Sequence, residues 1–302
     1  MSILVVGSVA FDVLKTPTKE ADRVLGGAAT YFALSASFFT PVNVVAVVGD
    51  DFTQADRAIF NGRSVDLSGL ETARGKTFRW GGEYSRDLSE RTTLFTDLGV
   101  FEKFQPTIPE HFRHSSLVFL ANIHPTLQVD VMSQVRSPRL IGADTMNYWI
   151  DRTPAELREM LSRIDVLVIN DEEARQLGGE HNLVRAAARI REMGPSTLVI
   201  KRGEYGVLCF RENERFATVS FPLEMVVDPT GAGDSFAGGF MGYLSTRAVL
   251  DHQAVRQAII FGSVLGSFCV EDLGTARLAR LTRDEVYERY QEFKTLTDFA
   301  SL

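Results

Sequence analysis

The sequence has little of what marks several large classes of protein. It carries two cysteines, Cys209 and Cys269, in 302 residues, and their wide spacing fits no zinc or redox motif. It has no cluster of lysine and arginine and a net charge of −7, which argues against sequence-independent binding of DNA or RNA. The apolar run within residues 1–14 follows no basic leader and is too short to span a bilayer. We therefore expect a cytoplasmic protein with no membrane partner.

The chain also lacks internal repeats, low-complexity tracts and any Pro-, Gly- or Ser-rich linker that would divide it. We expect a single domain over residues 1–302, although this length exceeds the usual domain size. The composition, 45% hydrophobic and 24% charged, is that of an ordinary globular protein. A chain of this length can bury a large core, so it needs no disulfides.

What the chain does contain is a series of short apolar runs that alternate with helical patterns. Most runs are continuously apolar, as expected for strands covered on both faces. They occupy residues 3–6, 42–48, 117–120, 140–143, 166–169 and 198–200. Helical patterns occupy residues 31–39, 154–164, 182–193, 234–244 and 254–270. This alternation predicts an α/β fold with a mostly parallel sheet and helices on both faces.

One segment interrupts the alternation. Residues 76–84 and 91–100 are rich in β-forming residues, and the polar stretch 85–90 between them can turn the chain. We expect a small antiparallel β lid that stands off the main sheet and includes part of residues 12–25. An ordinary edge hairpin is the alternative. The apolar residues of the lid offer a surface for a homodimer, unless they pack against the body of the chain.

The longest motif, DPTGAGDSF at residues 228–236, places a glycine-rich turn between a strand end and a helix. Gly231 and Gly233 let main-chain N–H groups approach a ligand with no β-carbon in the way. The first N–H groups of a helix lack internal partners and carry partial positive charge, so this turn suits a phosphoryl group. Asp234 begins the same helix and can orient and deprotonate an attacking hydroxyl.

For a short Gly-x-Gly-Asp segment, the simpler interpretation would be that the glycines form a tight turn and that Asp234 caps a helix. The full stretch, however, closely resembles the signature of the ribokinase-like, or PfkB, carbohydrate kinase family. The resemblance spans nearly the whole chain and implies a ribokinase-like fold with ATP as the phosphate donor. It also implies that Asp234 is the catalytic base and that the amides of Gly231, Ala232 and Gly233 form the anion hole.

Two further motifs resemble the acceptor site of that family. Asp12 ends the segment GSVAFD and matches an aspartate that holds substrate hydroxyls, with a turn-forming aspartate as the alternative. Gly26 and Gly27 match a Gly-Gly turn that opens a helix beside the acceptor. Tyr31 stands where many members have asparagine, and it offers one hydroxyl and a stacking face, which leaves room for a nucleoside. Asn122 is another candidate polar contact.

Other segments resemble the nucleotide side of the family's site. Asn170 and Glu173 match an Asn-x-x-Glu motif that organises Mg²⁺ and phosphates through water, with an acidic helix start as the alternative. Lys201, Gly203 and Gly206 belong to a segment that resembles the Gly-x-x-Gly turn under the nucleotide, where a solvated turn cation is the alternative for Lys201.

Three positions complete the set that the resemblance implies. Thr230 precedes the anion hole, and Gly274 lies in a late loop that resembles the one near the adenine. In relatives, main-chain oxygens around that loop and the position of Asp228 hold a monovalent cation, which points to K⁺.

We therefore expect an ATP-dependent kinase that phosphorylates a hydroxymethyl group of a small sugar. A nucleoside kinase of the same fold is the alternative within the class. A nucleotide-binding sensor without catalysis and a dinucleotide-dependent oxidoreductase are alternatives of other classes. The intact Asp234 and its glycines argue against the sensor, and GAGDSF is only a partial match to the GxGxxG pattern of the oxidoreductase.

Overall fold

The computed structural model of the protein describes residues 1–88 and 90–298. Within these residues, nine strands form the main sheet in the order β13-β12-β11-β10-β9-β8-β1-β4-β5. Their bounds are β1 (Ile3–Val6), β4 (Val42–Val48), β5 (Val65–Thr72), β8 (Leu117–Leu120), β9 (Leu140–Ala143), β10 (Val166–Asn170), β11 (Thr197–Lys201), β12 (Val207–Arg211) and β13 (Glu214–Thr218). All neighbours from β5 to β11 are parallel, and β11, β12 and β13 are antiparallel at one edge.

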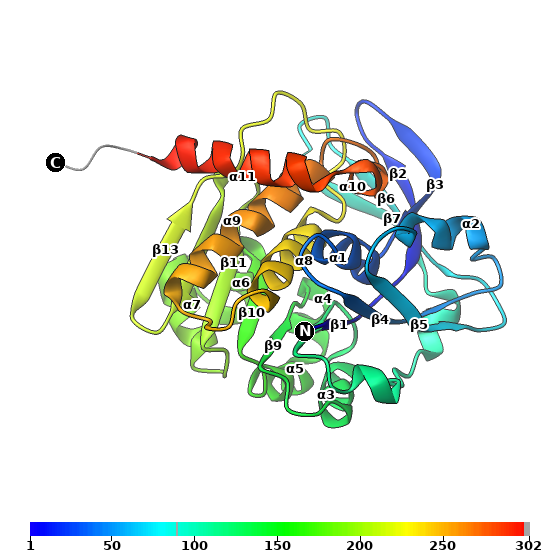
Figure 1. Cartoon of the computed structure of the whole chain (residues 1–302), viewed down its shortest axis with the longest axis horizontal. Helices are drawn as coiled ribbons and strands as arrows, with labels where there is room; N and C mark the ends of the chain where they lie inside the picture. Colours follow the sequence, from blue (N-terminus) through cyan, green and yellow to red (C-terminus); the bar gives the residue numbers. More distant parts are fainter. Residues whose placement is uncertain (89, 299–302) are drawn as a thin grey trace.

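The continuously apolar strands lie in the middle of this sheet because helices cover both of its faces. On one face lie α1 (Ala28–Ala36), α8 (Ala232–Ser245), α9 (His252–Cys269), α10 (Ala276–Arg280) and α11 (Arg283–Thr297). On the other lie α3 (Pro125–Gln134), α5 (Pro154–Leu161), α6 (Asp171–Gly178) and α7 (Leu183–Arg191). The predicted α/β architecture is confirmed (Figure 1).

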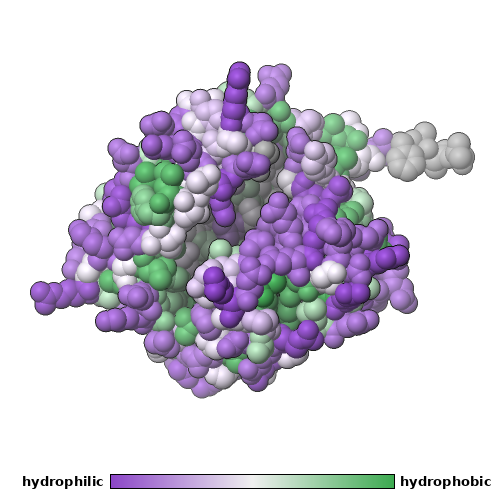
Figure 2. All heavy atoms as spheres, turned by 180° about the vertical axis from the view of Figure 1, so that it is seen from behind, coloured by the Kyte–Doolittle hydropathy of each residue, from purple (hydrophilic) through white to green (hydrophobic). Residues whose placement is uncertain are grey.

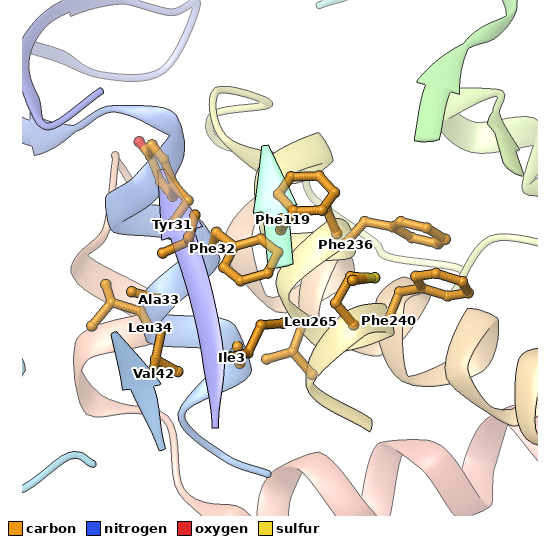
Figure 3. Packing of buried hydrophobic residues seen from close by; sticks show 14 of the residues in the cluster. Ile3, Tyr31, Phe32, Ala33, Leu34, Val42, Phe119, Phe236, Phe240 and Leu265 are labelled. Carbon is orange, nitrogen blue, oxygen red and sulfur yellow. The ribbon is translucent and has the colours of Figure 1, made fainter. Parts of the chain in front are cut away.

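The larger core cluster holds α8 close to the sheet. Phe32 of α1 stacks on Phe119 of β8 with ring centroids 4.6 Å apart. Phe236 and Phe240 of α8 point into the same cluster, as Figure 3 shows. This packing fixes the start of α8, and with it the glycine-rich turn, relative to the strand ends.

A second sheet of four strands stands off the main sheet at the upper right of Figure 1. It contains β2 (Ala10–Lys15), β3 (Glu20–Gly26), β6 (Phe78–Tyr84) and β7 (Arg91–Asp97), in the order β3-β2-β6-β7. The predicted hairpin is present as β6 and β7, but it is joined to the earlier hairpin by a parallel pairing of β2 with β6. We call these four strands the small sheet.

In the part of the chain that the structure describes, no helix combines the length and the apolar character needed to cross a membrane.

Candidate active site

The predicted site residues gather at one edge of the main sheet. The carboxyl ends of parallel strands meet at the same edge, and ligands of open α/β sheets bind there. Asn122 follows β8, Asp144 follows β9, Asn170 ends β10 and Lys201 ends β11. The surface seen from behind is hollowed near its centre, with hydrophilic side chains around the hollow (Figure 2).

The glycine-rich turn adopts the conformation that its sequence predicts. Gly231 is the N-cap of α8 with φ 76°, a left-handed conformation that favours glycine. The first α-helical hydrogen bond of α8 runs from the N–H of Ser235 to the carbonyl of Gly231, at 2.8 Å. The amides of Gly233 and Asp234 precede it and have no intrahelical acceptor four residues back. They form the base of an anion site at the helix start.

Lys201 completes this anion site from the sheet side. A β-carbon at Gly233 would stand 2.6 Å from Lys201 Nζ, so the ammonium lies against the bare glycine backbone. The amides, the helix start and the ammonium all favour negative charge at one place. The arrangement fits the phosphate groups of a nucleotide, whose oxygens are anionic acceptors.

Asp234 lies in the first turn of α8 and is half-buried. Burial raises its pKa from 3.8 to about 6, against the opposing effect of the Lys201 and Arg91 cations. The carboxylate is therefore mostly ionised at neutral pH, yet more basic than an ordinary aspartate. A base with its pKa near the working pH is well matched to proton transfer from a hydroxyl.

Further carboxyl groups face the same space. Asp12 is 4% exposed, and burial, followed by repulsion from Asp228 and Asp234, raises its pKa to about 7. Burial also raises the pKa of Asp144 well above its ordinary value, with repulsion from Asp234 adding to the shift. Asp144 Oδ1 is buried and has no hydrogen-bond partner among the described residues, so it is free to accept one from a ligand.

The acceptor candidates Gly26, Gly27 and Tyr31 lie beside this space with different environments. A β-carbon at Gly26 would overlap the carboxylate of Asp12, and Gly27 has φ 92° and starts α1. Tyr31 is 1% exposed, and its ring packs beneath Gly231. The expected open stacking face is therefore absent at Tyr31, because the turn that forms the anion site covers the ring.

Asn122 is engaged with a neighbouring aromatic group. Its Oδ1 accepts a hydrogen bond of 2.9 Å from Trp149 Nε1, and its Nδ2 lies 3.1 Å from Met146 Sδ. The ring of Trp149 also meets that of His124 edge-on, with centroids 5.0 Å apart. Asn122 thus holds Trp149 in place at this end of the sheet.

Asn170 and Glu173 form a reciprocal capping box at the start of α6. Asn170 Oδ1 accepts from the Glu173 N–H, and Glu173 Oε2 accepts from the Asn170 N–H, both at 2.8 Å. Asn170 and Glu173 therefore satisfy each other's main-chain N–H groups at the start of α6. Glu173 is buried, which raises its pKa, and the nearby Lys201 cation opposes this shift.

Asp228, which is fully buried, ties two loops of the site together. Its Oδ1 accepts from the N–H of Thr230 at 2.9 Å, and its Oδ2 accepts from the N–H of Gly274 at 2.8 Å. The loop that was expected near the adenine is thereby held against the turn before the anion site. Thr230 also bonds to the small sheet, because its Oγ1 lies 2.8 Å from the hydroxyl of Tyr84.

Gly203 and Gly206 lie in a short turn after Lys201 with φ values of 53° and 81°. A β-carbon at Gly206 would overlap the carbonyl of Thr218, whereas the position above Gly203 is open. Glycine at 206 therefore lets the turn pack onto the end of β13.

Three residues of the site were not recognised from the sequence: Tyr84, Arg91 and Asp144. Asp144 follows a predicted strand, so its position at a carboxyl strand end was an available signal. Tyr84 and Arg91 lie at the two ends of the predicted turn of the hairpin, and no local pattern shows which face of a hairpin looks inward.

Comparison with known proteins decides the family. A family profile described as pfkB family carbohydrate kinase matches residues 2–280. The chain belongs to the pfkB family of carbohydrate kinases. This pfkB-family kinase is 31% identical to a cytidine kinase of Thermococcus kodakarensis over 250 residues, which are 80% of this chain and 88% of that one. It is 25% identical to a nucleoside kinase of Methanothermobacter thermautotrophicus over 295 residues, 90% of each chain.

Solved structures share the fold of the pfkB-family kinase. Arabidopsis thaliana ribokinase, in a complex with ribose and ATP, has a TM-score of 0.78 at 21% identity and covers 96% of this chain and 98% of its own. A Methanocaldococcus jannaschii nucleoside kinase has a TM-score of 0.77 at 20% identity, with the same coverage. The kinase is thus a phosphotransferase of the sugar and nucleoside kinase class, with an alcohol group as acceptor.

Proposed function

We propose that this kinase transfers the γ-phosphate of ATP to a hydroxymethyl group of a nucleoside, with Asp234 as the base. One observation carries the proposal. A carboxylate with a pKa of about 6 stands in the first turn of α8, one residue after Gly233, whose backbone borders Lys201 Nζ. Base and anion site are therefore close enough to serve one hydroxyl and one phosphoryl group.

The chain's own groups have distinct tasks in this transfer. Asp12, with its high pKa and buried position, binds an acceptor hydroxyl and orients it. Asp234 accepts the proton of the attacking hydroxyl as the new bond from oxygen to phosphorus forms and the bond to the ADP oxygen breaks. The amides of Gly231, Gly233 and Asp234, with Lys201, bind the phosphoryl oxygens and stabilise their charge. The amide of Ala232, which was expected to join them, donates instead to the carbonyl of Pro229 at 3.2 Å.

ATP with Mg²⁺ supplies the phosphoryl group and the divalent charge that balances its oxygens. In the described residues, no group of three or more His, Cys, Asp or Glu side chains is placed to hold a metal. With so few carboxylate ligands nearby, a bound Mg²⁺ would keep several waters and phosphate oxygens as ligands, and Glu173 would contact it through water. Around the adenine end, Asp228 and Gly274 would shape a main-chain site for K⁺, since their hydrogen bond fixes the two loops.

The acceptor is proposed to be a nucleoside because of the extent of the similarities. The cytidine kinase and nucleoside kinase relatives align over 80% and 90% of the chain. A ribokinase of Haemophilus influenzae is 32% identical but aligns over 46% of the chain. A small sugar is the second candidate, since ribokinases also share the fold.

The small sheet is proposed to act as a lid, and its outer side as a homodimer contact. Leu94 and Phe95 are 43% and 37% exposed on β7, whereas Phe78 stacks on Phe101 of the body at 5.4 Å. The apolar surface that is left exposed is therefore on β7. Sedimentation of the protein against a Leu94→Lys variant would test this contact, and a wild-type monomer would contradict it.

A phosphate-transfer screen with radiolabelled ATP over ribonucleosides and free sugars tests the proposed function. Cytidine and other ribonucleosides are expected to be labelled, and labelling of sugars alone would reject the nucleoside. Asp234→Asn should retain ATP affinity and lose most turnover, by roughly 10²–10⁴-fold. A variant that keeps its turnover would remove Asp234 from the role of base.

A further inference from the structure

Tyr84 connects the small sheet to the turn that forms the anion site. It is the last residue of β6, directly before the turn of the hairpin, and it is half-buried. Its hydroxyl lies 2.8 Å from Thr230 Oγ1, a residue 146 positions further along the chain. Thr230 precedes Gly231, which is the N-cap of α8. One hydrogen bond therefore joins the tip of the small sheet to the glycine-rich turn.

The direction of this hydrogen bond follows from the other partner of Thr230. Burial raises the pKa of Asp228, and hydrogen bonds from the Gly274 N–H and from the Thr230 hydroxyl oppose this rise. A hydroxyl has one proton, so the Thr230 oxygen that donates to Asp228 can only accept from Tyr84. Burial also raises the pKa of Tyr84, which keeps the phenol protonated and able to donate. The chain of donors runs from Tyr84 to Thr230 to Asp228.

The polar groups of Thr230 are held from three sides. Its N–H donates to Asp228 Oδ1 at 2.9 Å, and its carbonyl accepts from Cys269 Sγ at 3.4 Å. Both of these partners belong to the body of the protein, whereas Tyr84 belongs to the small sheet. The position of the small sheet therefore contributes to the orientation of residue 230 and of Gly231 after it.

The other hairpin of the small sheet meets the loop that Asp228 holds through Gly274. Thr275 Oγ1 donates to the carbonyl of Leu25 on β3 at 3.1 Å, and Lys19 Nζ lies 2.8 Å from Asp272 Oδ1. The Lys19 side chain is 46% exposed, so this ion pair contributes little. The more sheltered contact between Tyr84 and Thr230 is the stronger candidate for coupling the two parts.

We propose that Tyr84 is a positioning residue that makes the shape of the phosphate site depend on the small sheet, through its hydrogen bond to Thr230. The inference rests on the proposed function, in which Asp12 holds the acceptor and the turn at Gly231 holds the phosphate. Asp12 lies on β2, which pairs directly with β6. A bound acceptor thus holds the sheet where Tyr84 reaches Thr230. Acceptor and nucleotide should strengthen each other's binding, because both favour the same arrangement of the turn.

Calorimetry measures this coupling as a ratio of two dissociation constants of a non-hydrolysable ATP analogue, one without and one with saturating acceptor. The acceptor is cytidine or, if the phosphate-transfer screen labels sugars alone, the labelled sugar. In the wild-type protein the ratio should be at least about five. Tyr84→Phe should lower the ratio roughly 2–10-fold, which is the factor that one hydrogen bond of this kind contributes.

Tyr243 supplies a matched control. Its hydroxyl donates to Gln257 Oε1 at 2.7 Å near the far end of α8, so Tyr243→Phe also removes one partly buried phenol hydrogen bond. Both variants should lower Tm by a similar amount, but only Tyr84→Phe should lower the ratio of dissociation constants. A purely structural role of Tyr84 would lower Tm and leave that ratio unchanged.

Changes at Thr230 test whether Tyr84 acts through it. Thr230→Val removes the accepting oxygen and should lower the ratio at least as much as Tyr84→Phe does. Thr230→Ser keeps the hydroxyl and should retain the wild-type ratio. In the Thr230→Val protein, the further change Tyr84→Phe should have no effect, because the hydrogen bond is already lost.

Three results would overturn the proposal: a wild-type ratio of one, a Tyr84→Phe ratio equal to that of the wild type, or an effect of Tyr84→Phe that is the same in the Thr230→Val protein. Failure of the proposed function is distinguishable from these results. It is read from the turnover of Asp234→Asn and from the screen, whereas the ratio of dissociation constants requires neither the base nor turnover.

Discussion

Lys201 Nζ lies where it would meet a β-carbon on Gly233 at 2.6 Å. The two residues belong to different elements, the end of β11 and the start of α8, and only the absence of a side chain at 233 allows the approach. The glycine therefore serves two purposes: it bares an amide and admits a cation beside it. Both groups stabilise negative charge at the same place.

Gly233→Ala should reduce activity without unfolding the protein. The added methyl meets the far end of a flexible lysine side chain, which can move, so we expect the ammonium to be displaced while the backbone stays. Removal of one oriented donor of this kind costs roughly 10²–10³-fold in kcat. Gly142→Ala on β9 is the control, since its β-carbon would also meet the end of a flexible side chain, Met241 Cε at 3.1 Å, and lies outside the turn. Equal kcat values for the two variants would contradict the expected displacement of the Lys201 ammonium.

Gly231→Ala should damage stability as well as activity. Gly231 has φ 76°, and its β-carbon would overlap the ring of Tyr31, which is buried and cannot move aside. Gly203→Ala separates the two causes, since Gly203 has φ 53° but open space above it. We expect Gly203→Ala to cost about 1 kcal/mol of unfolding free energy from backbone strain. Gly231→Ala should cost at least about 1 kcal/mol more from overpacking. Denaturant unfolding would measure both losses of stability. An equal loss in Gly203→Ala and Gly231→Ala would refute the contact between residue 231 and the Tyr31 ring.

The pH dependence of kcat/KM should report the ionisation of Asp234. A base must be ionised to accept a proton, and burial raises this pKa to about 6. The rate should therefore rise about tenfold per pH unit below pH 6 and level off above it. An inflection near pH 4, typical of an exposed aspartate, would show that the carboxyl is not in the buried setting described.

Asp12→Asn should stabilise the protein in a pH-dependent way. The pKa of Asp12 is about 7 when folded and near 3.8 when unfolded, so above pH 7 the folded state carries a charge that burial disfavours. This penalty is complete above pH 7, shrinks as pH falls and vanishes below about pH 4. The isosteric amide removes it, so Tm should rise by roughly 3–8 °C at pH 8 and by about a quarter of that at pH 4.5. A gain in Tm that is the same at both pH values would show that burial does not raise the pKa of Asp12.

Much of the fold follows from local pattern. The predicted runs at residues 42–48 and 117–120 coincide with β4 and β8, because both strands are buried on both faces and therefore read as uninterrupted apolar segments. Strands β5, β12 and β13 were not predicted. Most of β5 is not buried, and β13 at the edge mixes polar with apolar residues, so neither reads as an apolar run. β12 is mostly apolar but was not identified as a strand.

The sequence by itself determined the family, the alternation of strand and helix, and the glycine-rich turn with Asp234, because these depend on residues that are neighbours in the chain. Only the tertiary structure decided that Tyr31 lies beneath the turn and that Lys201 borders Gly233. These relationships join residues far apart in the sequence. Each depends on how α8 and the small sheet pack against the main sheet, and a local sequence pattern does not predict that packing.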